Sequence, residues 1–180
     1  RFPAAVSKLT HALRLARSFA ILSRAMLGRG PIRARALGER LAQFPASGLP
    51  VESPVDIRWN DHQVPWINAA TDRDCAVALG AVHAHLRLTQ LEVLRKVAYG
   101  RVAEIAGPAA IDVDRALRTL GIAQAVPGIL AMQPPETKAW LEGFVDGLNH
   151  VIDNAPEDPP DFPLLGLAPE KVLERLFWQE

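Results

Sequence analysis

The stretch Leu79-Gly-Ala-Val-His-Ala-His-Leu-Arg-Leu-Thr-Gln-Leu-Glu-Val-Leu-Arg-Lys-Val-Ala-Tyr-Gly-Arg-Val-Ala-Glu-Ile-Ala-Gly107 decides how this chain folds. From Cys75 onward apolar residues recur every three or four positions on one face, which predicts a helix. Further leucines and Ala84 widen the apolar face, as in a helix packed on more than one side. We expect Gly100 to end this helix and residues 102–105 to form a short turn. The predicted buried face consists of Leu79, Val82, Leu86, Val93 and Val97.

Two short strands are predicted before the long helix. Residues 55–59 alternate between apolar and polar side chains, and residues 64–69 return after a turn at Asn60 and Asp61. This pattern is typical of a β-hairpin. Thr71 with Asp74 forms a weak capping box, so we expect the long helix to start there.

Three further helical segments are predicted after the long helix. Pro127 and Gly128 break the helical pattern between the first two of them. A core stripe of Trp140, Phe144, Leu148 and Val151 marks the second. Residues 153–163 hold four prolines and four acidic residues, so they are predicted to be an irregular loop. The three segments are residues 111–120, residues 138–152 with Thr137 as the cap, and residues 169–178.

The first part of the chain is strongly basic. Residues 1–44 contain nine Lys or Arg and a single acidic residue, Glu39, although the whole chain has no net charge. Residues 3–28 read as a basic amphipathic helix, which either docks on the protein or lies on an anionic membrane surface. We expect a shorter helix at residues 32–44 and a proline-containing linker at residues 45–54. Because the first residue is Arg1 rather than Met, a processed or trimmed chain is expected.

This pattern predicts two regions in a chain of 180 residues. Residues 1–50 form a basic helical extension with its linker, and residues 51–180 form the main folded region. No apolar run approaches the ~20 residues that a membrane-spanning helix needs. The single cysteine, Cys75, excludes an internal disulfide and is predicted to be a small core residue.

The residues themselves predict no metal-ligating or catalytic group in this chain. His83 and His85 lie two positions apart on a helix, so their side chains point in nearly opposite directions and cannot share one metal ion. His62 is expected in the hairpin turn, and His150 near a helix end, where a cation is favoured. Arg101 and Glu104 are predicted to form a surface ion pair. Four acidic residues suggest calcium by type, but their spacing favours a solvated loop: Asp153, Glu157, Asp158 and Asp161.

Three blocks in the expected order resemble the α subunit of the penicillin acylase family of N-terminal-nucleophile hydrolases. The first is residues 55–69, similar to the family's opening hairpin. The second matches Gly-Tyr-x-x-Ala-Gln-Asp-Arg-Leu-x-Gln-Met-Glu and then Gly-x-x-Ala-Glu-x-x-Gly. The third, residues 141–153, is similar to a later Gly-Tyr-x-x-Gly-x-Asn helix. The second block matches through Gly80, Ala84, Arg87, Leu88, Gln90, Glu92, Gly100, Ala103, Glu104 and Gly107.

Four positions depart from the family pattern. The family's Gln and Asp are His85 and Leu86 here, and its hairpin Gly and the His after Pro are Gln63 and Trp66. These positions look structural, so the departures concern caps and ion pairs.

The resemblance implies a fold class that is mostly α with a short N-terminal β-hairpin, the α-chain part of an αββα hydrolase completed by a separate β subunit. It implies a self-processed heterodimer that hydrolyses the amide bond of an N-acyl substrate, either a penicillin or cephalosporin side chain or an acyl-homoserine lactone. The nucleophile would be the first residue of the β subunit, so no catalytic residue is expected in this chain, and its substrate-binding residues are not assigned.

The same resemblance implies no cofactor for catalysis, allows a structural calcium ion without a ligand from this chain, and implies a periplasmic or secreted enzyme. The β subunit and a small N-acyl substrate are the implied partners, and no nucleic acid is expected. The alternative is a non-catalytic scaffold or binding relative, associated with a membrane surface through residues 1–30.

Overall fold

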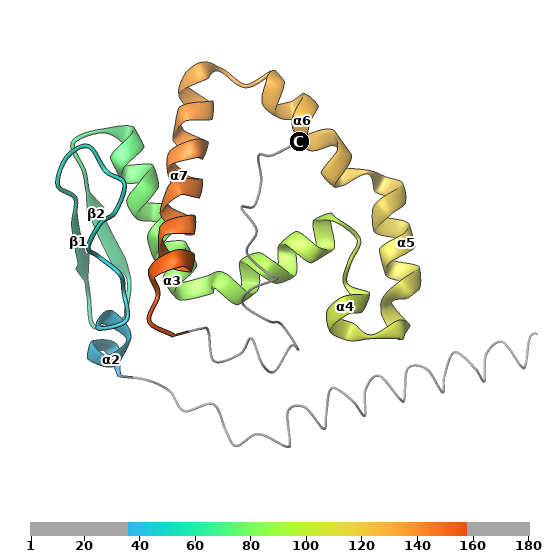
Figure 1. Cartoon of the computed structure of the whole chain (residues 1–180), viewed down its shortest axis with the longest axis horizontal. Coiled ribbons are helices and arrows are strands. Elements are labelled where there is room, and N and C mark those ends of the chain that lie inside the picture. Colours follow the sequence, from blue (N-terminus) through green and yellow to red (C-terminus); the bar gives the residue numbers. More distant parts are fainter. Residues whose placement is uncertain (1–35, 158–180) are drawn as a thin grey trace, which may run out of the picture.

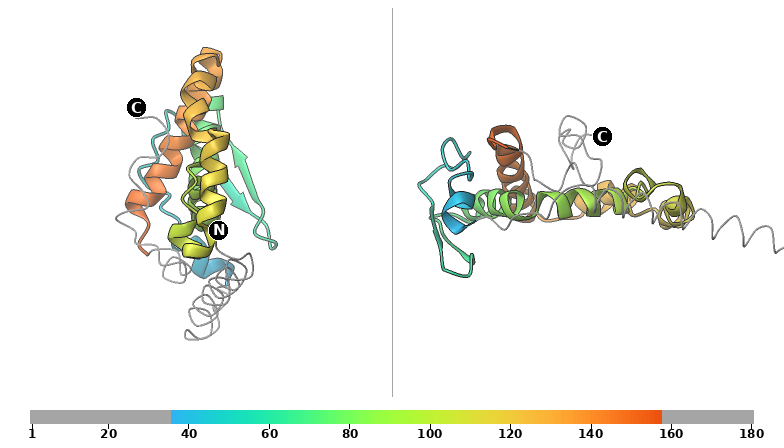
Figure 2. Two further views of the ribbon diagram at one scale, coloured as in Figure 1. Left: turned by 90° about the vertical axis from the view of Figure 1, so that its right-hand side faces the viewer. Right: turned by 90° about the horizontal axis from the view of Figure 1, so that it is seen from below.

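The computed structural model describes residues 36–157 of the chain. The longest element in this part is the helix α3 (Asp72–Ala98), which has 27 residues (Figure 1). Seen from below, α3, α5 and α6 lie in one thin layer, and α7 crosses α3 on one side of that layer (Figure 2). The other elements are α2 (Leu37–Leu41), β1 (Asp56–Trp59), β2 (Pro65–Asn68), α4 (Ala103–Ala106), the 3₁₀ turn η1 (Pro108–Ala110), α5 (Ile111–Leu120), α6 (Ile122–Ala131) and α7 (Pro135–Asn154).

The predicted hairpin is confirmed. β1 and β2 pair antiparallel, with Asp56 opposite Asn68 and Trp59 opposite Pro65. Asn60 closes the turn, because its carboxamide oxygen accepts from the backbone N–H of Val64 at 2.9 Å. Gln63 adopts a φ of 61°, the left-handed region that favours glycine.

The core lies where α3 and α7 cross, and glycines allow the close approach. A Cβ at Gly80 would overlap the carbonyl of Phe144, and one at Gly147 would overlap the carbonyl of Val77. The backbones therefore touch directly, as they do when small residues face one another across a helix pair. The buried cluster beside this contact consists of Ala81, Ala84, Leu88, Leu148 and Val151.

The buried face of α3 differs from the predicted one. Val82 is buried as expected, but Leu79, Leu86, Val93 and Val97 are only half-buried. The most buried positions carry small side chains instead, because α7 approaches too closely for larger ones. α3 is also kinked at Arg87, whose φ and ψ of −143° and 24° are not helical. The buried positions of its first half include Ala76, Val77, Ala78, Gly80, Ala81 and Ala84.

The predicted start of α3 is half right. Thr71 is the N-cap, and its hydroxyl accepts from the backbone N–H of Asp74 at 3.0 Å. The Asp74 carboxylate, however, turns away from the cap and accepts from the backbone N–H groups of Glu52 at 2.8 Å and Ser53 at 3.2 Å. Those hydrogen bonds, which stabilise the ionised form, lower the pKa of Asp74. Asp74 therefore fastens the incoming linker to the helix.

Helix boundaries after α3 correct three predictions. α6 runs through Pro127 and Gly128, although a proline inside a helix removes one backbone hydrogen bond. α7 begins at Pro135, so Thr137 lies inside its first turn and is not the cap. Proline suits that first position, where its missing N–H has no partner to lose. α7 also continues to Asn154, past the predicted start of the acidic loop at residue 153.

The predictions for residues 3–28 and 169–178 lie outside the described residues. Of the helix predicted at residues 32–44, the structure has α2, and the predicted linker that follows contains no helix or strand. No helix between residues 36 and 157 is long and apolar enough to cross a membrane. The division of the chain at residue 51 stays a prediction.

Candidate functional site: the charge network after α3

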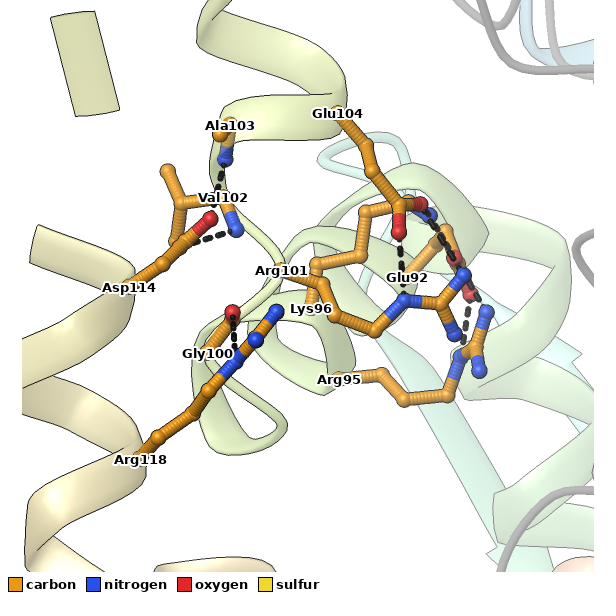
Figure 3. Close-up of polar contacts among 10 residues, drawn as sticks. All are labelled: Glu92, Arg95, Lys96, Gly100, Arg101, Val102, Ala103, Glu104, Asp114 and Arg118. Carbon is orange, nitrogen blue, oxygen red and sulfur yellow. Dashed lines mark hydrogen bonds and ion pairs between the residues drawn. The ribbon is translucent and has the colours of Figure 1, made fainter. Parts of the chain in front are cut away.

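Charged residues gather where α3 ends and the chain turns back through α4 into α5 (Figure 3). Gly100 makes this turn with a φ of 62°. A Cβ there would lie 2.7 Å from the carbonyl oxygen of Asp114, so glycine is required both by conformation and by space. The Gly100 carbonyl accepts from Nε of Arg118 at 2.9 Å. The turn is thus tied to α5.

Asp114 supplies the cap that α4 lacks. Val102, at the N-cap position of α4, has no side-chain oxygen to offer. The two carboxylate oxygens of Asp114 instead accept from the backbone N–H groups of Val102 at 2.6 Å and Ala103 at 2.9 Å (Figure 3). Asp114 is buried, and a carboxylate at a helix N-terminus also interacts favourably with the helix dipole. α5 therefore holds the short helix in place.

Glu92 is the largest fully buried side chain of the described residues, with 1% of its surface exposed. A buried carboxylate needs cationic or hydrogen-bonding partners, since desolvation of an unpaired charge is costly. Glu92 has two such partners on its own helix. Arg95 donates to both of its oxygens, through Nε at 2.6 Å and through Nη2, and the Lys96 ammonium lies 3.3 Å away.

Glu104 joins α4 to this buried group. It accepts from Nζ of Lys96 at 2.7 Å and from Nε of Arg101 at 2.6 Å. The hydrogen bonds from Arg101, followed by those from Lys96, lower the pKa of Glu104 to about 2. The predicted surface ion pair between Arg101 and Glu104 is confirmed, and Lys96 additionally connects it to the interior.

The network is chemically a structural one. A general acid or base needs a pKa near the working pH, whereas that of Glu104 lies far below it. The oxygens of Glu92, Glu104 and Asp114 are all engaged by cations or by backbone N–H groups. The arrangement fixes the angle at which α4 and α5 leave α3.

The predicted histidines lie in separate environments. The His83 ring packs edge-on against Phe144, with centroids 5.4 Å apart. His85 packs between two other aromatic rings, 5.3 Å from Phe44 and 6.3 Å from Trp59. Its Nε2 atom is buried and has no hydrogen-bond partner.

The remaining predicted candidates are scattered. His62 is exposed at the hairpin turn, and Nε2 of His150 lies 2.9 Å from the Pro45 carbonyl oxygen. Cys75 is a half-buried free thiol rather than a fully buried one. Asp153 and Glu157 are exposed, and Asp158 and Asp161 lie outside the described residues. Between residues 36 and 157, no three His, Cys, Asp or Glu side chains are placed to hold a metal ion.

Three buried carboxylates were missed as organising residues. Asp74 and Asp114 bind backbone groups 21 or 22 and 11 or 12 residues away in the chain, so local patterns give no sign of them. Glu92 did leave a signal. It stands four residues before Lys96 in an apolar helix, and such a spacing indicates an ion pair.

The described residues thus form a helical framework with an internally satisfied charge network. The sequence profile described as Penicillin amidase matches residues 54–179. The chain belongs to the penicillin amidase family of N-terminal-nucleophile hydrolases, as the Gly100–Gly107 signature predicted.

Curated relatives of two kinds match the same region. The acyl-homoserine lactone acylase QuiP of Pseudomonas aeruginosa is 36% identical over 117 residues, which cover 64% of this chain and 14% of QuiP. The penicillin acylase 2 proenzyme of Pseudomonas sp. strain SE83 is 33% identical over 67% of this chain and 16% of its own length. Penicillin G acylase of Escherichia coli is 30% identical over 71% of this chain and 16% of its own length. The chain spans about one-seventh of the length of the relatives it matches.

Proposed function

We propose that this chain is the α-subunit region of a self-processed heterodimeric acylase that hydrolyses the amide bond of an N-acyl substrate. The observation that carries the proposal is the family match over residues 54–179. The substrates in the relatives' names, acyl-homoserine lactones and penicillins, both carry an acyl group joined to an amine through an amide bond. We therefore propose acyl-homoserine lactones and the side chains of penicillins or cephalosporins as the substrate classes.

In this proposal the chain is framework and the reacting groups lie on the partner. A Ser, Thr or Cys at the start of the β subunit attacks the amide carbonyl, and its own α-amino group takes the proton. Backbone or side-chain donors stabilise the negative charge that develops on the carbonyl oxygen. The described residues would contribute the rigid support, through the α3–α7 crossing and the turn held by Asp114.

The remaining expectations from the resemblance are proposals of the same kind. We propose a periplasmic or secreted location. We also propose a structural calcium ion in the complete protein, although residues 36–157 contain no group of ligands that fits one. Treatment with a chelator, followed by thermal unfolding with and without added calcium, tests whether calcium binds and stabilises the complete protein.

The decisive experiment uses the complete gene product. Mass spectrometry of the purified protein is expected to find two chains, the second beginning with Ser, Thr or Cys. The assay follows free homoserine lactone from an N-acyl-homoserine lactone and the free β-lactam amine from penicillin G. Replacement of the first residue of the second chain by Ala is the control, and it is expected to abolish the release of both products. Two chains without amide hydrolysis on any N-acyl substrate would favour the non-catalytic scaffold instead.

A further inference from the structure

The helices α5 and α6 carry apolar side chains that the described part of the chain does not cover. On α5, Val113 and Leu120 are 51% and 71% exposed, and on α6, Ile122 and Ile129 are 45% and 50% exposed. Exposed apolar residues are ordinary when they are scattered, but a run of them on neighbouring helices indicates an interaction surface. We call the α5–α6 apolar surface these four exposed residues together with the half-buried Leu117 and Val126 that lie between them on the two helices.

On each helix these residues follow a regular stripe. Positions 113, 117 and 120, and positions 122, 126 and 129, are spaced by four and three residues, the spacing of one helix face. On α5 this stripe is not the side that meets the rest of the structure. Asp114 and Arg118 bind the turn after α3, and they lie roughly 110° around the helix from the centre of the stripe. The side of α5 that carries Asp114 and Arg118 thus meets the turn, whereas Val113 and Leu120 of the apolar stripe stay exposed.

α6 has a second reason to need a partner. None of its ten residues, all of them described, is buried, so it gains no stability from the core (Figure 1). A helix of this length is marginal in water, and it contains both Pro127 and Gly128, which lower helix stability. A helix that is neither intrinsically stable nor packed requires contacts from outside to persist.

The composition of α6 indicates what kind of surface covers it. From Ile122 to Ala131 it contains no charged residue, and Gln124 is its only polar side chain. The surface that complements α6 is therefore apolar and uncharged. The matched residues of this chain cover only 14% of QuiP and 16% of penicillin G acylase, so most of the polypeptide that completes the family's fold lies outside these residues.

We propose that the α5–α6 apolar surface is the docking site for an apolar face of the part of its own precursor that lies outside this chain. The proposal rests on the proposed function in one respect, that the chain belongs to a larger polypeptide. It assigns the contact to α5 and α6, whereas α3 and α7 pack against one another in the described core.

Hydrogen exchange measured by mass spectrometry tests the docking. The complete gene product is compared with the separately expressed 180-residue chain, and the readout is the exchange of peptides that cover residues 122–131. We expect these amides to exchange on the order of 100-fold more slowly in the complete protein, because α6 opens easily without its cover. Equal exchange rates in the two proteins would overturn the proposal. So would self-association of the isolated chain that protects α6 to the same degree, since the occupant would then be a second copy.

A matched pair of variants on α6 gives the second readout. Ile129→Glu places a charge in the apolar stripe, and Gln124→Glu places the same charge on the opposite side of the helix. In the complete protein, Ile129→Glu is expected to restore fast exchange in α6 and to lower the yield of assembled protein at least about 10-fold, a charge buried without a partner being costly. Gln124→Glu should leave both unchanged. Equal behaviour of the two variants would contradict the docking.

The proposed function is tested by a different measurement on the same samples. The number of chains and amide hydrolysis report processing and catalysis, whereas exchange in α6 reports docking. A complete protein that stays a single chain yet protects α6 would remove the proposed processing and keep the docking. A processed, active protein with an unprotected α6 would do the reverse.

Discussion

Gly147 of α7 lies directly on the backbone carbonyl of Val77 of α3, so that no side chain of any size fits between the two helices. Gly80 has the same relation to Phe144 in the opposite direction. The crossing is therefore set by two reciprocal contacts between a glycine and a carbonyl, and the buried cluster around Leu148 is built beside them.

Gly147→Ala is expected to destabilise the chain strongly. The new methyl group would meet backbone atoms that cannot move without separating the helices, so we expect a loss of about 3 kcal/mol in the free energy of unfolding. Urea unfolding followed by circular dichroism measures it. Gly128→Ala is the matched control, since a Cβ there meets nothing within 4 Å and alanine should raise helix stability by about 0.5–1 kcal/mol. Similar losses in both variants would contradict the close contact.

Asp114→Ala should separate the end of α3 from α5. It leaves the N–H groups of Val102 and Ala103 without their acceptor, at an expected cost of about 2–3 kcal/mol. Asp112→Ala is the control on the same helix, because Asp112 is exposed and forms an ion pair with the exposed Arg115. That change should cost less than about 0.5 kcal/mol. Thermal unfolding of the two variants checks the difference.

Gln63 combines strain with a useful contact. Its positive φ costs on the order of 1 kcal/mol, while its side-chain oxygen accepts a hydrogen bond from Nη1 of Arg40. Gln63→Ala keeps the strain and loses the bond, whereas Gln63→Gly loses both. We therefore expect the glycine variant to be about 1 kcal/mol more stable than the alanine variant in urea unfolding. The same difference should persist in an Arg40→Ala background, and its absence would show that the turn is not strained.

Sequence patterns predicted the elements whose signal is local. The alternation at residues 55–59, the cap at Thr71 and the stripe from Trp140 to Val151 each depend on neighbours within a few positions, and each is confirmed. The family signature from Gly100 to Gly107 likewise identified the turn that carries the charge network.

What the sequence did not predict depends on distant partners. Large apolar residues were expected to mark the buried face of α3, but the approach of α7 made Gly80 and its alanine neighbours the buried ones. The role of Asp74 could not be inferred for the same reason, because its partner Glu52 lies 22 residues earlier. The break expected at Pro127 is absent, and α6 continues through it.

Glu104 gives the chain a dependence on acid. Its pKa in the folded state, about 2, lies below the ordinary value of 4.5, so the unfolded chain takes up a proton first as the pH falls. The stabilisation is complete above about pH 4.5 and is lost progressively towards pH 2. Because the side chain is half-exposed, water screens the interaction, and we expect Glu104→Gln to cost only about 1 kcal/mol at pH 7. The variant should lose less stability than the wild type between pH 5 and pH 2.5, and Glu142→Gln, on exposed α7 surface, should follow the wild type.

His85 is expected to weaken the fold at mildly acidic pH. Burial beside Phe44 and Trp59, and then the charge of Arg40, lower the pKa of its imidazole below the ordinary 6.5. The unfolded chain therefore binds a proton at this side chain at a higher pH than the folded chain does. The free energy of unfolding consequently falls as the pH drops from about 6.5 towards the pKa of the folded state. Protonation is unfavourable here because the buried Nε2 would become a donor with no acceptor.

Replacement of His85 by Gln, the residue of the family pattern, removes this titration. We expect the difference in unfolding free energy between pH 7.5 and pH 5 to become smaller in His85→Gln than in the wild type. His62→Gln serves as the control, because His62 is exposed in the hairpin turn. Urea unfolding of all three proteins at both pH values provides the comparison. An unchanged difference in His85→Gln would mean that the acid sensitivity arises elsewhere, whereas a smaller one assigns it to the ring packed between the linker, the hairpin and α3.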